Sequence, residues 1–187
     1  MSKPEFFLWL DLETSGLDAS YDAILEVAMI LTGSDFKPIA EFESVIDLGD
    51  GRSSSLAARA IARMPKHVFE MHQSSGLMHE FMFADGRTKW QDIERALCGF
   101  LRDHGAIEDV ILAGGSIHFG RRFIDARWPE FAGHLHHRML DVTSLALAHQ
   151  AHGGELYEKK KAHRAMPDIL ESIAEFKWLC EKFGLRT

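Results

Sequence analysis

The sequence predicts an α/β protein built on a mixed five-stranded sheet, an antiparallel meander followed by parallel strands, with helices flanking both faces. Three apolar stretches near the N-terminus are joined by short connections, as consecutive antiparallel strands are. Further along, short apolar stretches alternate with segments of helical periodicity, which is typical of parallel strands joined by helices. A length of 187 residues with 46% hydrophobic content suits one packed domain, so we expect residues 1–187 to form a single domain.

The N-terminal half is expected to contain three strands, several short helices and one longer helix. The strands are expected within residues 6–18, 23–32 and 38–46, which are apolar and bounded by turn-forming residues. Residues 53–82 alternate small, basic and methionine-rich stretches, which favour short helices. Apolar residues recur at helical spacing through residues 89–104, which predicts an amphipathic helix.

In the C-terminal half we expect strands at residues 110–113 and 139–142 and a helix at residues 143–150. Another helix should follow residue 116 and end near Pro129, because a proline inside a helix breaks it. The last helix is expected to begin at Pro167, since proline suits the first helical position. Its inner face is predicted to consist of Ile169, Leu170, Ile173, Phe176, Cys180 and Phe183.

Charge and composition limit the possible partners. The formal net charge of −7 argues against binding of long nucleic acids by phosphate neutralisation, whereas short anionic substrates bridged by a metal ion remain compatible with it. A triple lysine at residues 159–161 is expected to be a solvated loop or, beside His163, a phosphate contact. No membrane-spanning run or signal pattern is seen, so we expect a cytoplasmic protein with no membrane partner. Cys98 and Cys180 fall in predicted helices and should be buried, unpaired side chains.

Asp11 and Glu13 lie at the end of the first predicted strand, in the stretch FFLWLDLETSGLD. Side chains two residues apart point to the same side of a strand, roughly 6.5–7 Å apart. Two like charges in an apolar strand repel each other unless a cation lies between them, and oxygen ligands suit Mg²⁺ or Mn²⁺ better than zinc. The pattern therefore indicates a metal site, with a half-exposed acidic strand face as the alternative.

His163 and Asp168 form a second constellation, in the stretch HRAMPD. If the helix starts at Pro167, Asp168 lies in its first turn, where the helix dipole stabilises an acid. His163 then lies on the preceding loop, where a histidine can act as a general base near neutral pH. A helix N-terminal acid beside a surface histidine is the alternative interpretation.

Together these motifs resemble the DEDDh 3′-to-5′ exonucleases, and within that family the oligoribonucleases. The similarity runs in order through DLETSGLD, GGSIHFGRRFI, LHHRMLDVTSL and HRAMPDI, and so through nearly the whole chain. The resemblance implies a ribonuclease H-like exonuclease fold and a homodimer. It also implies a metal-dependent 3′-to-5′ exoribonuclease that hydrolyses dinucleotides and other very short RNAs to 5′-mononucleotides.

The resemblance assigns the catalytic roles. Asp11, Glu13 and Asp168 would hold the metal ion on the side of the nucleophile, and Asp11 would bridge to a second ion. His163 would deprotonate the attacking water. Two divalent ions, Mg²⁺ or Mn²⁺, would stabilise the entering and leaving oxygens of the phosphodiester.

The resemblance also assigns substrate-binding residues. Leu17 matches the residue that wedges between the two bases in the family. Ser116, Arg138 and Thr143 match the residues that hold the terminal 5′ phosphate, partly from the partner subunit of a homodimer. Arginine suits this task because its guanidinium offers a fork of hydrogen-bond donors.

The sequence departs from the family at Gly120, where alignment of GSIHFGRRF places the fourth acid. Glycine has no side chain to bind a metal ion, and we do not expect the nearby Asp125 or His118 to replace it. Losing such a ligand should cost at least about 10–100-fold in metal affinity or activity. The protein would then be a weakened or one-metal nuclease, a catalytically silent relative that binds short nucleotides, or a chain engineered at this residue.

Two histidines replace aromatic residues of the family. His67 stands where the family has a base-stacking tryptophan, and His137 where it has a tyrosine near the scissile phosphate. A histidine ring stacks with less area, so the preference for dinucleotides is weakened, and a general exonuclease of single-stranded DNA or RNA is a further alternative. His134, His136 and His137 lie close in sequence, but we expect surface or phosphate-binding roles for them rather than a zinc site.

Overall fold

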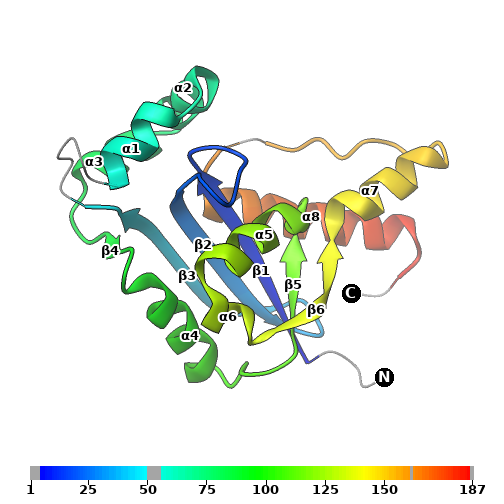
Figure 1. Ribbon diagram of the computed structural model, residues 1–187. Helices are drawn as coiled ribbons and strands as arrows, with labels where there is room; N and C mark the ends of the chain where they lie inside the picture. Colours follow the sequence, from blue (N-terminus) through cyan, green and yellow to red (C-terminus); the bar gives the residue numbers. More distant parts are fainter. Residues whose placement is uncertain (1–4, 50–55, 161, 186–187) are drawn as a thin grey trace.

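Two sets of apolar side chains alternate along the central strand β1 (Phe6–Thr14) of the computed structural model, which describes residues 5–49, 56–160 and 162–185. Leu8, Leu10 and Leu12 belong to one buried apolar cluster, whereas Trp9 belongs to a second. Successive side chains of a strand point to opposite faces of the sheet, so both faces of the sheet are covered. The molecule therefore has three layers, with the sheet in the middle (Figure 1).

The sheet has six strands in the order β4-β3-β2-β1-β5-β6. β1 pairs antiparallel with β2 (Ile24–Gly33), which pairs antiparallel with β3 (Pro38–Asp47). On its other side β1 pairs parallel with β5 (Val110–Gly114), which pairs parallel with β6 (Leu135–Asp141). The predicted meander followed by parallel strands is confirmed. The predicted number of five strands is wrong by one, because the edge strand β4 (Thr88–Lys89) has only two residues and gives no periodic pattern.

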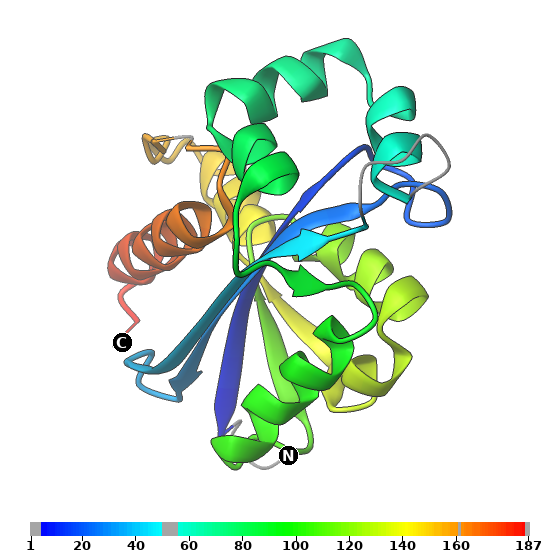
Figure 2. The same ribbon diagram turned by 90° about the vertical axis from the view of Figure 1, so that its left-hand side faces the viewer.

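Helices cover both faces of the sheet. The Leu8 face packs against α1 (Leu56–Arg63), α3 (Leu77–Phe83), α4 (Ile93–Asp103), α5 (Ile117–Arg127) and α6 (Pro129–Ala132). The Trp9 face packs against α7 (Val142–Ala151) and α8 (Ala165–Lys182). Helices α1, α2 (Lys66–Ser74) and α3 lie together beside the end of the sheet at which β1 finishes (Figures 1 and 2). None of the helices in the described ranges is long and apolar enough to cross a membrane.

Several predicted boundaries are wrong. Helix α4 begins at Ile93 rather than at residue 89, because residues 88–89 pair with β3. β6 begins at Leu135, four residues before the predicted strand, and its C-terminal neighbour Val142 already belongs to α7. The short helices predicted for residues 53–82 are present as α1, α2 and α3, although residues 53–55 lie outside the described residues.

The last helix differs from its prediction in two ways. α8 begins at Ala165, two residues before Pro167, and tolerates the proline because N–H groups of the first turn have no intrahelical acceptor. Leu170 is 52% exposed and Phe183 39% exposed, so neither belongs to the buried face, whereas Ile169, Ile173, Phe176 and Cys180 do. Cys98 and Cys180 are buried free thiols, as predicted.

Candidate active site

Three carboxylates converge beneath helix α8. Asp11 and Glu13 alternate with the leucines of β1 and therefore point to the face that α8 covers. Asp168 lies in the first turn of α8. One oxygen from each of the three side chains lies within 4.8 Å of the other two, although 155 or more residues separate Asp168 from the other two acids in sequence.

The cluster is electrostatically unfavourable without a cation. Burial, with repulsion from Asp168, raises the pKa of Asp11 to about 7. Burial, with repulsion from Asp11, raises the pKa of Glu13 to about 8. Burial also raises the pKa of Asp168. Three desolvated oxygen donors this close fit a hard divalent cation such as Mg²⁺ or Mn²⁺, because its charge would restore the ionised form of each acid.

His163 adjoins the cluster, on the loop that was predicted for it. Its backbone lies in the left-handed region at φ 53°, and its side chain is half-buried. Burial has the largest effect on the pKa of Asp168, and the charge that His163 carries when protonated would oppose it. The backbone N–H of Asp168 donates to the carbonyl of Arg164 at 3.1 Å, which closes the turn between the histidine and the acid.

Arg164 anchors this turn, a role that the sequence motif did not reveal. Its guanidinium donates to Glu26 of β2 at 2.7 and 3.0 Å and to Glu80 of α3 at 2.8 and 3.0 Å. The second oxygen of Glu26 accepts the backbone N–H of Ala165 at 2.9 Å. Glu26 is fully buried and stands opposite Glu13 in the β1–β2 ladder. The position of Glu26 inside the otherwise apolar stretch AILEVAMIL is the sequence feature that could have indicated this buried acid.

His72 of α2 lies beside Glu13, and no pattern in the sequence indicated it. The imidazole is fully buried, and its Nε2 donates to the carbonyl of Thr14 at 2.9 Å. Its Nδ1 lies 3.6 Å from an oxygen of Glu13. Burial lowers the pKa of His72, so the ring is held neutral with its unprotonated nitrogen facing the acid.

Two of the predicted phosphate-binding residues meet at the start of α5. The backbone N–H of Ser116 donates to Oγ1 of Thr143 at 2.9 Å, and the two hydroxyls lie 3.2 Å apart. The carboxylate of Asp141 accepts the backbone N–H groups of Ser116 and Thr143, and it thereby joins the ends of β5 and β6. Arg138 lies on β6 with an exposed side chain. From the lysine-rich loop, Lys159 pairs with the buried Glu175 at 2.5 Å, so it is not merely a solvated surface residue.

The remaining predicted contacts are exposed. Leu17 is 75% exposed on the loop between β1 and β2. His67 is exposed on α2, and the His137 ring stacks on His136 with 4.1 Å between centroids. Within the described ranges the three acids of the cluster are the group with metal-binding spacing, and the histidine stretch around His137 does not form one.

Gly120 lies on α5 beside the cluster. It lines a cavity of about 90 Å³ together with Asp11, Ser116 and Phe119. A Cβ added at Gly120 would meet Leu10 and Ile117 side chains at 3.5 and 3.8 Å, which is ordinary contact. Asp125 is exposed and pairs with Arg121 at 2.8 Å, and Nδ1 of His118 lies 3.4 Å from Asp141. Within the described residues, neither side chain belongs to the three-carboxylate group.

Comparisons with known proteins agree with this geometry. An exonuclease (RNase T) family model matches residues 8–176. Oligoribonuclease of Francisella tularensis subsp. tularensis (strain WY96-3418) is 33% identical over 183 residues, which is 97% of this chain and 98% of that protein. Oligoribonuclease of Tropheryma whipplei (strain Twist) is 32% identical over 184 residues, which is 96% of this chain and 94% of that protein.

Solved structures share the fold. The zinc-bound complex of E. coli exonuclease I with single-stranded DNA superposes with a TM-score of 0.58 at 14% identity, covering 96% of this chain but only 41% of that chain. Exonuclease I of Methylocaldum szegediense gives a TM-score of 0.58 at 14% identity, covering 95% of this chain and 40% of that one. The ribonuclease H-like exonuclease fold expected from the sequence is therefore confirmed. The chain belongs to the exonuclease family and, within it, to the oligoribonucleases.

Proposed function

We propose that the protein is a 3′-to-5′ exoribonuclease that depends on a divalent metal and hydrolyses dinucleotides and other very short RNAs to 5′-mononucleotides. The observation that supports this most is the convergence of Asp11, Glu13 and Asp168 beside His163, in a chain of the oligoribonuclease family. We further propose that residues 1–187 act as one catalytic domain, in the cytoplasm.

The three acids are proposed to hold Mg²⁺ or Mn²⁺, with Asp11 shared between two ions. A divalent ion bound there acts as a Lewis acid and increases the acidity of water. His163 takes the proton from the attacking water, and Arg164 fixes the turn from which it acts. His72 lies beside Glu13, with its Nδ1 3.6 Å from a carboxylate oxygen, and its buried neutral ring helps to exclude water from that acid.

Substrate contacts are proposed around this centre. Leu17 separates the two bases, and His67 and His137 stack on or contact the nucleotide. A second set of side chains holds the terminal 5′ phosphate: Ser116, Arg138 and Thr143. The hydroxyl pair at the start of α5 supports this role for two of the three. We propose that the active form is a homodimer, because the family completes this phosphate site from the partner subunit.

Gly120 favours a second candidate, a protein that binds short nucleotides without cleaving them. The cavity of about 90 Å³ beside Asp11 leaves room where another acid would stand. We retain hydrolysis as the first proposal because the other three acids and the histidine are present together.

Hydrolysis of 5′-labelled dinucleotides and of longer RNA and single-stranded DNA tests both candidates. We expect the chain to cleave dinucleotides with Mg²⁺ or Mn²⁺ and to lose at least about 100-fold in rate in His163→Ala, the range that a general base contributes. Asp168→Asn should also slow cleavage because it removes one acid of the cluster, whereas the control Asp125→Asn, which changes an exposed acid outside the cluster, should not. If no RNA or DNA is cleaved while a dinucleotide still binds, the silent candidate replaces the enzyme.

A further inference from the structure

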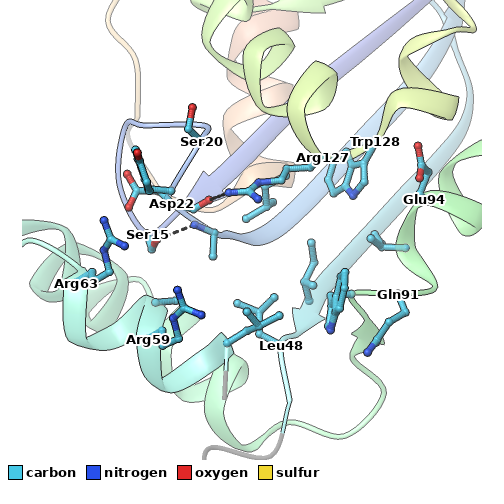
Figure 3. Close-up of a pocket in the computed structure, with 18 residues that line it drawn as sticks. Ser15, Ser20, Asp22, Leu48, Arg59, Arg63, Gln91, Glu94, Arg127 and Trp128 are labelled. Carbon is cyan, nitrogen blue, oxygen red and sulfur yellow. Dashed lines mark hydrogen bonds between the residues drawn. The ribbon is translucent and has the colours of Figure 1, made fainter. Parts of the chain in front are cut away.

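A larger cavity, of about 470 Å³, lies on the opposite face of the sheet from the carboxylate cluster. Its floor includes Ile24, Ile46 and Ile93, which belong to the apolar cluster around Leu8 rather than to the cluster around Trp9. The cavity opens between the β1–β2 loop, α1 and the start of α4 (Figure 3). Its size is that of small-molecule binding sites.

The floor of this pocket is apolar and its mouth is aromatic. Ile46, Leu48 and Ile93 are at most 8% exposed and form a closed base. Trp90 lines the cavity just before α4 and is 46% exposed, which is unusual for so large an apolar side chain. Gln91 beside it supplies an amide at the same end of the pocket (Figure 3). This end can therefore hold a planar ring that also needs hydrogen bonds.

The other end of the pocket is cationic. Arg59 and Arg63 lie four residues apart on α1, and both line the cavity (Figure 3). Like charges at this spacing destabilise a helix. Neither guanidinium pairs with a carboxylate in the part of the chain that the structure describes, and Arg63 lies over the ring of Tyr21 at 5.3 Å. An anion bound between them would relieve the repulsion.

The acids that line the pocket are fewer than its arginines. The carboxylate of Asp22 accepts the backbone N–H of Asp18 at 2.9 Å. Glu94 accepts the N–H groups that begin α6, including that of Glu130 at 2.7 Å. A third guanidinium, that of Arg127, donates to the backbone carbonyl of Asp22 at 3.0 Å, so three arginines line the cavity against these two acids. The pocket thus combines an aromatic end, an apolar floor and an excess of positive charge.

We propose that this pocket binds a nucleoside 5′-monophosphate, with the phosphate between Arg59 and Arg63 and the base against Trp90. A phosphate matches paired guanidinium groups, and a base stacks on an indole ring. The ligand is of the same class as the product of the proposed hydrolysis. The idea that the enzyme itself supplies this nucleotide rests on the proposed function, whereas the binding of the nucleotide to the pocket does not.

Calorimetric titration of the full-length Asp11→Asn/Glu13→Gln protein in EDTA tests the site without the candidate active site. Adenosine 5′-monophosphate is the probe, and ribose 5-phosphate, adenosine and decanoate are compared with it. We expect a Kd for the monophosphate below about 1 mM, and at least about tenfold weaker binding of each comparison compound. Arg59→Gln/Arg63→Gln and Trp90→Ala should each weaken binding at least about tenfold, whereas Arg102→Gln on α4 should not.

Three results would overturn the proposal. The first is that the monophosphate does not bind at 10 mM, a concentration on the order of ten times the expected Kd. The second is that the monophosphate binds the Arg59→Gln/Arg63→Gln protein with unchanged affinity, which would mean that it binds at another site. The third is that ribose 5-phosphate or decanoate binds as tightly as the monophosphate, which would mean that the pocket is a general anion or fatty-acid site. Because this background is disabled for hydrolysis, each result is independent of the exonuclease assay.

Discussion

Arg164 holds the fully buried carboxylate of Glu26 through two guanidinium nitrogens, at 3.0 and 2.7 Å. The two residues stand 138 positions apart in sequence. Hydrogen bonds to Glu26 raise the pKa of Arg164 further above its ordinary value. The pair ties the turn between His163 and Asp168 to the central sheet, and the same guanidinium also holds Glu80.

Removing the cation of this pair should destabilise the protein and slow the reaction. Arg164→Gln leaves Glu26 buried without its partner, a change that typically costs about 3–5 kcal/mol of unfolding free energy. Because the turn loosens, kcat should fall while KM changes less. Urea unfolding and dinucleotide kinetics measure the two effects.

The matched control is Arg95→Gln, which removes an exposed pair with Asp92 on α4. Its unfolding free energy should change by less than about 1 kcal/mol. Equal effects of the two substitutions would show that Arg164 does not anchor the turn.

The raised pKa values of Asp11 and Glu13, about 7 and about 8, make the metal-free protein less stable as pH rises. Between about pH 4 and pH 8 the folded protein holds protons that the unfolded chain has lost, so the free energy of unfolding falls across this window. Asp11→Asn removes one charge of the cluster. It should be near neutral at about pH 4 and stabilising at pH 8.5, by up to about 4 kcal/mol for a shift of roughly three pKa units.

Thermal unfolding in EDTA across this pH range measures the effect. Asp125→Asn, which removes an exposed acid, should give a difference from the parent protein that stays flat with pH. If the difference in thermal stability between Asp11→Asn and the parent protein also does not change with pH, the carboxylates of the cluster ionise at little cost in free energy.

The same pKa values predict that metal binding releases protons. Below pH 7 an ion must displace protons from Asp11 and Glu13, so the apparent affinity for Mn²⁺ should rise between pH 6 and pH 8 and level off above about pH 8. Calorimetry in buffers of different ionisation enthalpy counts the protons. An affinity that is constant from pH 6 to pH 9 would contradict the raised pKa values.

Local patterns predicted most of the fold. The apolar stretches of β1, β2 and β3 and the helical periodicity of α4 and α8 each identify an element, because burial imposes that periodicity on the sequence. Two failures have local causes. β4 is too short for a pattern. Leu170 follows Ile169 by a turn of about 100° around the helix, and this turn carries Leu170 toward solvent, where it is 52% exposed.

The sequence predicted the acids of the site but not their supports. Asp11 and Glu13 were found because strand periodicity puts them on one side, and Asp168 because of its place at a helix start. Glu26 and His72 were missed, since their contacts join elements that only the folded chain brings together. The acid inside AILEVAMIL marks Glu26 as unusual but does not identify its partner, and the fully buried His72 has no distinguishing spacing in the sequence.

The assignment of Arg138 to the 5′ phosphate predicts a selective loss. Arg138→Ala should raise KM about 10–100-fold for a 5′-phosphorylated dinucleotide, the value of a charged hydrogen bond of about 1.5–3 kcal/mol. The KM of the unphosphorylated dinucleotide should change little. Arg102→Ala, on the α4 surface, is the control. If Arg138→Ala raises KM equally for both dinucleotides, Arg138 does not bind the 5′ phosphate.

Gly120 predicts a gain of function. A Cβ at this position meets neighbouring side chains at 3.5–3.9 Å, and the adjoining cavity of about 90 Å³ borders Asp11, so an aspartate fits without displacing the helix. Replacing this helical glycine by alanine would also remove a cost of about 0.5–1 kcal/mol. Gly120→Asp should therefore increase Mn²⁺ affinity and the hydrolysis rate by about 10–100-fold, the range associated with residues that support a metal site. Gly120→Ala supplies the same Cβ without the carboxylate, and it separates the two contributions. If the alanine and aspartate variants behave alike in Mn²⁺ titration and in hydrolysis, the carboxylate does not reach the metal site.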